Sequence, residues 1–134
     1  MTTAPGRPRQ AADAAEVRPA LALLRAARLA TEALAAAVEG TGLTVDQWLT
    51  LELLATRSGD GLAMNELRAL TGMSGATLTR TVDKLIAESL AHREVDPFDR
   101  RRILVHVSRR GAALHAATAG DVDAADPGGV AARA

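Results

Sequence analysis

Three consecutive arginines, Arg100, Arg101 and Arg102, form the densest group of like charges in the chain. They follow residues 96–99, where Pro97 and two aspartates are typical of a turn. Guanidinium groups bind phosphate oxygens with paired hydrogen bonds and enter narrow minor grooves. The pattern therefore predicts contacts with a nucleic-acid backbone or minor groove. A solvated basic loop without a partner is the alternative.

A second polar group precedes the arginines, on a helix predicted over residues 75–89. Ser74 can cap this helix, and Leu78, Val82 and Leu85 share one side of it. The first half of the opposite side is small and hydroxylic, which suits a major groove about 12 Å wide. An ordinary surface helix is the alternative. The residues expected to contact DNA from this helix are Ser74, Thr77, Thr79, Arg80 and Lys84.

Several short elements must hold these groups in place. A short helix is predicted over residues 65–70, followed by a turn in which Gly72 can adopt a positive φ. Residues 91–95 and 103–107 are predicted as antiparallel strands, and the second of them alternates with period two. These residues, 62–107, together form one predicted unit, which we call the reader segment. It consists of the short helix, the turn, the capped helix and the basic pair of strands.

The charge of the chain is unevenly distributed, although its formal net charge is +0. Residues 64–110 carry nine basic and six acidic side chains, a net charge of +3. Residues 29–63 carry one basic and five acidic side chains, a net charge of −4. Positive charge gathers in the reader segment, as is typical of a surface that binds nucleic acid.

The composition excludes several classes of protein. Aromatic residues are only 1% of the chain, so the core must be built from aliphatic side chains, which favours helices. The absence of cysteine excludes disulfides, thiolate metal ligands and thiol redox sensing. No apolar run reaches about 18 residues, and no signal-peptide pattern begins the chain. We expect a cytoplasmic protein with no membrane partner.

Two helices are predicted before the reader segment. The first covers residues 17–39, and it can pack on its own domain or on a second copy of the chain. Its stripe of apolar and small residues, spaced as on one helix face, is Leu23, Ala27, Ala30, Leu34 and Ala37. The second helix begins at Thr44, which forms a predicted capping box with Gln47. Trp48 in this helix is expected to fill the core, and the alternative is a wall of a ligand pocket.

The two ends of the chain are predicted to be disordered tails, over residues 1–16 and 120–134, because proline, glycine and charge are frequent there. The last helix is capped by Ser108 and is expected to end near Ala119. A single folded domain over residues 17–119 remains between the tails.

The titratable residues give little indication of catalysis. The chain has no cysteine or tyrosine, and its histidines, His92, His106 and His115, are scattered over three predicted elements. His92 and His106 can face each other on the paired strands, but no HExxH or paired-ligand spacing is present. We therefore predict no catalytic residue, no metal site and no cofactor.

Residues 43–115 resemble the MarR family of bacterial transcription regulators. The segments that carry the resemblance are LTVDQWLTLELLA, SGATLTRTVDKL and DPFDRRRILVHVS. The resemblance implies a mainly α fold with a small β-hairpin wing, a winged helix-turn-helix with an N-terminal dimerisation helix. It also implies a homodimer whose recognition helices enter the major groove and whose wings enter the minor groove. By the same resemblance Thr79 and Arg80 lie at the DNA surface, Arg100 enters the minor groove, and Asp83 pairs with Arg101 to brace the wing.

The sequence departs from the family pattern in three places. Ser89 stands where a glycine often ends the recognition helix, and Ala63 stands where a capping residue is common. The C-terminal helix is shortened. We expect the homodimer to form through residues 17–39 and this short last helix.

Together these patterns predict a sequence-specific, double-stranded DNA-binding transcriptional regulator. We expect a repressor that binds a near-palindromic operator as a homodimer. The resemblance also leaves room for a small-molecule effector. A winged-helix module that binds proteins and not specific DNA is the alternative, although such modules usually have a less basic wing.

Overall fold

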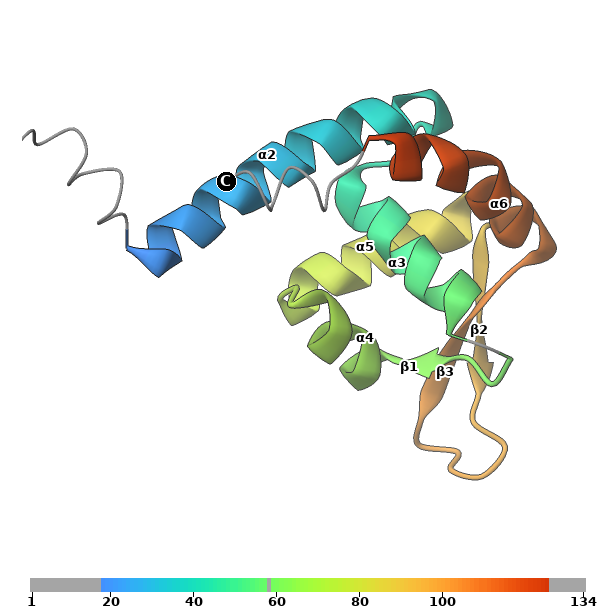
Figure 1. Ribbon diagram of the computed structural model, residues 1–134. Coiled ribbons are helices and arrows are strands. Elements are labelled where there is room, and N and C mark those ends of the chain that lie inside the picture. Colours follow the sequence, from blue (N-terminus) through green and yellow to red (C-terminus); the bar gives the residue numbers. More distant parts are fainter. Residues whose placement is uncertain (1–17, 58, 126–134) are drawn as a thin grey trace, which may run out of the picture.

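A computed structural model describes residues 18–57 and 59–125, which form helices around a small sheet (Figure 1). The helices are α2 (Pro19–Val38), α3 (Val45–Thr56), α4 (Met64–Thr71), α5 (Gly75–Ala87) and α6 (Arg109–Ala124), with a 3-10 turn η1 (Glu39–Thr41) after α2. The strands are β1 (Leu62–Ala63), β2 (Ala91–Val95) and β3 (Ile103–Val107). The mainly α fold with a hairpin wing is confirmed. The tail predicted over residues 1–16 and most of the one over 120–134 lie outside the described residues. No helix in the described part is long and apolar enough to cross a membrane.

The sheet has one more strand than the sequence predicted. Its order is β1-β3-β2, antiparallel throughout, and β2 and β3 have the predicted bounds. β1 pairs Leu62 with Val105 and Ala63 with Leu104. Two residues are too few to display a period-two pattern, so this strand could not be recognised from the sequence.

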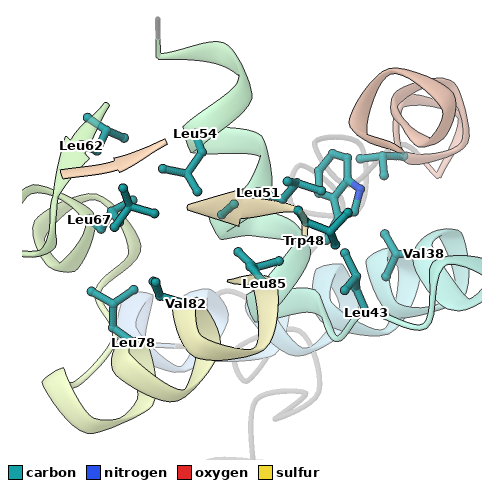
Figure 2. Packing of buried hydrophobic residues seen from close by; sticks show 14 residues of the cluster. Val38, Leu43, Trp48, Leu51, Leu54, Leu62, Leu67, Leu78, Val82 and Leu85 are labelled. Atoms are coloured by element: carbon teal, nitrogen blue, oxygen red, sulfur yellow. The ribbon is translucent and has the colours of Figure 1, made fainter. Parts of the chain in front are cut away.

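The core lies between α3, α5 and the sheet. Leu51 of α3, Leu67 of α4, and Val82 and Leu85 of α5 are fully buried, and Figure 2 shows these side chains gathered in one cluster. Val105 of β3 completes it from the sheet. α3 is the central helix, because it packs on α2, α4, α5, α6 and β3.

The helix ends follow the predicted caps. Thr44 accepts a hydrogen bond from the Gln47 backbone N–H, and the Gln47 side chain accepts one from Thr44 N–H. Gly72 has φ +73 at the end of α4, as expected of the turn. Ser89, which replaces a glycine, also has a positive φ of 60° after α5. This left-handed conformation is uncommon for residues other than glycine.

The two halves of α2 have different surroundings. Val38 near the C-terminal end is buried, with Leu34 and Ala37 packed against the core. In the first half, the exposed leucines are Leu21 (57%), Leu23 (71%) and Leu24 (49%). Figure 1 shows this half projecting beyond the other helices. Part of the predicted stripe therefore packs on its own chain, and the rest is uncovered.

The last helix is longer than predicted. α6 runs from its Ser108 cap to Ala124, so the expected end near Ala119 and the domain boundary at 119 are wrong. Gly120 is the reason for the shorter prediction, but a glycine inside a helix costs only about 0.5–1 kcal/mol. Val122 beyond it is buried in the core, and this burial favours continuation of the helix.

Candidate nucleic-acid interface

The helix-turn-helix is assembled by local hydrogen bonds around Gly72. Thr71 Oγ1 accepts a hydrogen bond from Met73 N–H at 3.2 Å and donates one to the Leu67 carbonyl at 2.8 Å. Ser74 then caps α5, since its Oγ accepts a hydrogen bond from Thr77 N–H at 3.2 Å. These hydrogen bonds fix the residue at which α5 begins after α4. They therefore determine which side chains lie in the exposed first turn of α5.

α5 presents a polar face to solvent. Its other face is buried, through Leu78, Thr81, Val82 and Leu85. Thr79 and Arg80 are exposed, as predicted, and Thr77 is partly exposed beside them. Ser74 Oγ donates to Thr77 Oγ1 at 3.0 Å, and an Arg80 nitrogen lies 3.4 Å from the same oxygen. Ser74, Thr77 and Arg80 thus form one hydrogen-bonded group, whereas the Thr79 hydroxyl donates to the Gly75 carbonyl.

Lys84 lies farther along the same exposed face. Its ammonium group donates a hydrogen bond of 2.9 Å to the Glu88 carboxylate, one turn away. This hydrogen bond, with the attraction of the positive charge, lowers the pKa of the Glu88 carboxyl below its ordinary value. Lys84 is exposed and charged, but part of its charge is balanced within the helix.

The wing is the β2–β3 hairpin and its tip. Asp96 N–H donates to the Arg102 carbonyl, and the Asp96 carboxylate accepts from Phe98 N–H at 2.8 Å. Arg101 is 93% exposed and its Nε lies 3.3 Å from Asp99. Arg100 is exposed, and among the described residues it takes part in no ion pair. The tip thus presents two exposed guanidinium groups, with that of Arg100 uncompensated.

The predicted brace between Asp83 and Arg101 is wrong. Asp83 pairs instead with Arg93 on β2, while Arg101 pairs with Asp99 within the tip. β2 packs directly against α5, whereas the tip lies beyond the ends of both strands. The resemblance implied Arg101 as the partner of Asp83, but the placement of β2 beside α5 brings Arg93 to this carboxylate instead.

A second brace was missed by the sequence analysis. Arg102, predicted as a DNA contact, pairs with Glu66 in the first turn of α4. Glu66 Oε1 also accepts a hydrogen bond from Ala63 N–H at 3.2 Å, which supplies half of a capping box where alanine has no oxygen to offer. One carboxylate therefore links the wing, β1 and the start of the helix-turn-helix.

Trp48 lies away from this interface, in α3. It is 4% exposed, and its ring stacks on His115 with centroids 5.3 Å apart. Its Nε1 is buried and has no hydrogen-bond partner within the described residues. The indole also borders a cavity of about 400 Å³, whose lining is Leu34, Val38, Val45, Trp48, Leu49, Glu52, Val122 and Asp123. Core packing is confirmed, and the geometry is compatible with the pocket-wall alternative.

Known proteins share both the sequence pattern and this architecture. Residues 41–102 match the profile described as MarR family. A probable transcriptional regulator from Pseudomonas aeruginosa is 30% identical, with a TM-score of 0.72 over 84% of this chain and 82% of that one.

Two structures with bound molecules are also similar. CouR from Rhodococcus jostii RHA1, bound to p-coumaroyl-CoA, is 30% identical, with a TM-score of 0.71 over 77% of this chain and 71% of that one. MepR from S. aureus, in complex with DNA, is 26% identical, with a TM-score of 0.62 over 69% and 75%. No curated protein matches the chain. The profile, the relatives that are 30% identical and the shared fold lead to one conclusion: the chain belongs to the MarR family of DNA-binding winged helix-turn-helix transcriptional regulators, which are not enzymes.

Proposed function

We propose that this regulator is a repressor that binds a near-palindromic operator as a homodimer. The observation that carries the proposal is the exposed polar face of α5, which lies beside a wing whose tip carries the uncompensated Arg100. A repressor acts by occupying DNA that RNA polymerase needs. A reader segment that binds both grooves is therefore sufficient for repression.

Sequence would be read from the first turns of α5. Arg80 can form two hydrogen bonds with a guanine edge, and Thr79 can contact a base edge or a thymine methyl group. Ser74 and Thr77 would set the register by contacts to the backbone. The Ser74 hydroxyl already caps α5 and donates a hydrogen bond to the Thr77 hydroxyl, so the contacts would be made by groups that are held in place before DNA arrives.

Affinity would come mainly from the basic groups. Arg100 would enter the minor groove, where A·T-rich DNA attracts arginine most strongly. Arg101 and Lys84 would bind phosphates. Arg102 would contribute to phosphate binding while its ion pair with Glu66 holds the wing in position.

The dimer would use the uncovered half of α2. Complete burial of an exposed leucine side chain contributes roughly 1.5–3 kcal/mol, and Leu21, Leu23 and Leu24 are all available. α6 packs on α2 and would complete the interface. The two reader segments of such a symmetric dimer would then bind operator half-sites that lie about one turn of the DNA double helix apart.

A small apolar or phenolic effector would bind in the cavity beside Trp48. The cavity is lined by α2, α3 and α6, the helices proposed for the dimer. A ligand there could change the distance between the two readers. CouR, one of the similar proteins, is bound to p-coumaroyl-CoA in its structure, which supports a search among aromatic acids and their thioesters.

The test is selection of bound DNA from a random pool, followed by anisotropy titration of the enriched sequence. We predict a near-palindrome bound by two chains, and a loss of at least about tenfold in affinity, or 1.4 kcal/mol, for Arg100→Ala. Arg110→Ala is the matched control, because Arg110 lies in the first turn of α6, at the far end of β3 from the tip. This variant should bind DNA as the wild type does. Equal affinity of wild type and Arg100→Ala would contradict the wing's role.

Repression has its own readout. A promoter carrying the enriched sequence should be transcribed less in the presence of the protein, and activation would reject the repressor assignment while leaving the operator intact.

A further inference from the structure

Two of the three histidines of the chain meet on the wing sheet. His92 of β2 and His106 of β3 are directly paired across the strands, and their rings stack with centroids 5.2 Å apart and an interplanar angle of 10°. Glu94 lies two residues after His92, so it occupies the same face of β2. The pairing of the strands thus gathers two imidazoles and one carboxylate that are separated in the sequence.

The distances among these groups are those of a metal's ligands. Glu94 Oε1 lies 3.1 Å from His92 Nε2, and Glu94 Oε2 lies 3.4 Å from His106 Nε2. The three residues can each offer an atom within 4.8 Å of the others. Zn²⁺ binds nitrogen and oxygen at about 2.0–2.2 Å, so tetrahedral ligand atoms lie roughly 3.3 Å from each other. Small rotations of exposed side chains would therefore be enough to bind an ion.

His106 is held in place for this role. Gly61 has φ +74, and a Cβ built there would come within 2.7 Å of the His106 ring, so only a glycine lets the backbone approach this closely. The Nε2 atom of His106 is buried and forms no hydrogen bond within the described residues, since Glu94 Oε2, although only 3.4 Å away, is not aligned for one. Leaving a buried polar atom unpaired costs about 1–3 kcal/mol, and coordination of an ion would remove this cost.

The site also has room for a further ligand. Glu94 and His106 line a cavity of about 400 Å³ at the base of the wing, together with Asp60 and Asp96. A water molecule or a further oxygen ligand could complete the coordination from this side. His92 and Glu94 are about half exposed, so an ion can reach the site from solvent without unfolding the sheet.

We propose that His92, Glu94 and His106 bind one divalent transition-metal ion of the Zn²⁺ class between β2 and β3. Two imidazoles and a carboxylate form a donor set that suits zinc and excludes a preference for Mg²⁺ or Ca²⁺. The ion joins the two strands of the wing at their base and stabilises the hairpin. The proposal rests on neither the proposed repressor function nor the proposed homodimer.

The experiment is a calorimetric titration of ZnCl₂ into the full chain, prepared without a histidine tag and freed of metal with a chelator. We expect one ion per chain and a rise in the unfolding temperature. Glu94→Gln and His92→Ala should each weaken binding by more than the roughly 10–100-fold cost of losing an outer-shell partner. Both side chains are about half exposed, so both variants should fold, which circular dichroism checks.

His115→Asn is the matched control, since it removes the remaining histidine, which lies near Glu52 in a separate pair. It should bind zinc as the wild type does. Cobalt provides a second readout, because Co²⁺ in a tetrahedral site absorbs visible light, and this absorption should be lost in Glu94→Gln. No zinc binding, unchanged binding in both site variants, or loss of binding in His115→Asn would each overturn the proposal.

Discussion

The exposed face of α5 and the first half of α2 are both uncovered in a single chain, but they expose different chemistry. α5 presents hydroxyls and charged groups, such as Thr79 and Arg80, which water solvates without cost. The first half of α2 presents leucines, which raise the free energy of the chain until another surface covers them. The exposed face of α5 is therefore stable in water without a partner, whereas the first half of α2 needs an apolar surface to cover it.

The support beneath the two surfaces also differs. α5 lies on fully buried Leu78, Val82 and Leu85, and its wing is braced by Asp83–Arg93 and Arg102–Glu66. Among residues 18–57 and 59–125, the first half of α2 has no buried residue, and the buried residue of this helix is Val38 at the other end. The reader is therefore supported within the described part of one chain, whereas the proposed homodimer would cover the first half of α2.

The largest expected effect comes from two matched leucine truncations. Leu67→Ala, at a fully buried position beneath the reader, should lower the free energy of unfolding by about 2–5 kcal/mol. Leu23→Ala should change it by no more than about 0.5 kcal/mol at concentrations where the chain is monomeric. Urea unfolding followed by circular dichroism measures both values, and similar losses would remove the distinction between the two regions.

The next effect concerns the apolar half of α2. Leu23→Glu places a charge in the proposed interface and should raise the dimer dissociation constant at least tenfold, about 1.4 kcal/mol. Ala22→Glu is the control, because it introduces the same residue at least about 100° around the helix from each of the three exposed leucines. Sedimentation velocity over a concentration series decides between them. A Leu23→Glu chain that dimerises like the wild type would place the interface elsewhere.

The smallest effect concerns the brace of the wing. A double-mutant cycle on Asp83 and Arg93 should give a coupling energy of about 0–1 kcal/mol in urea unfolding, because both side chains are partly exposed. The same cycle on Asp83 and Arg101 should give none. Coupling found only with Arg101 would restore the brace predicted from the sequence and reject the one in the structure.

The reader was largely predictable from the sequence because its signals are local. Ser74 caps the helix that follows it, Gly72 takes a positive φ, and the alternation within residues 103–107 identifies a strand. Each signal needs only a few neighbouring residues to be recognised. The predicted strand bounds agree with the structure for the same reason.

The errors arose where the structure depends on distant residues. The partner of Asp83 follows from how β2 is placed beside α5, which no local pattern specifies. The sequence predicts too short an α6 because Gly120 locally favours a helix end, whereas the burial of Val122 beyond it depends on distant residues. Such contacts are decided by the packing of the whole chain.

The salt dependence of DNA binding tests the central claim most directly. With the selected operator, the logarithm of the association constant should fall linearly with the logarithm of salt concentration, with a slope of about −0.9 for each phosphate neutralised. A shuffled duplex of the same length provides the comparison for specificity. We predict a steep slope and weaker binding to the shuffled duplex, and a flat response with equal affinity for both duplexes would contradict the account.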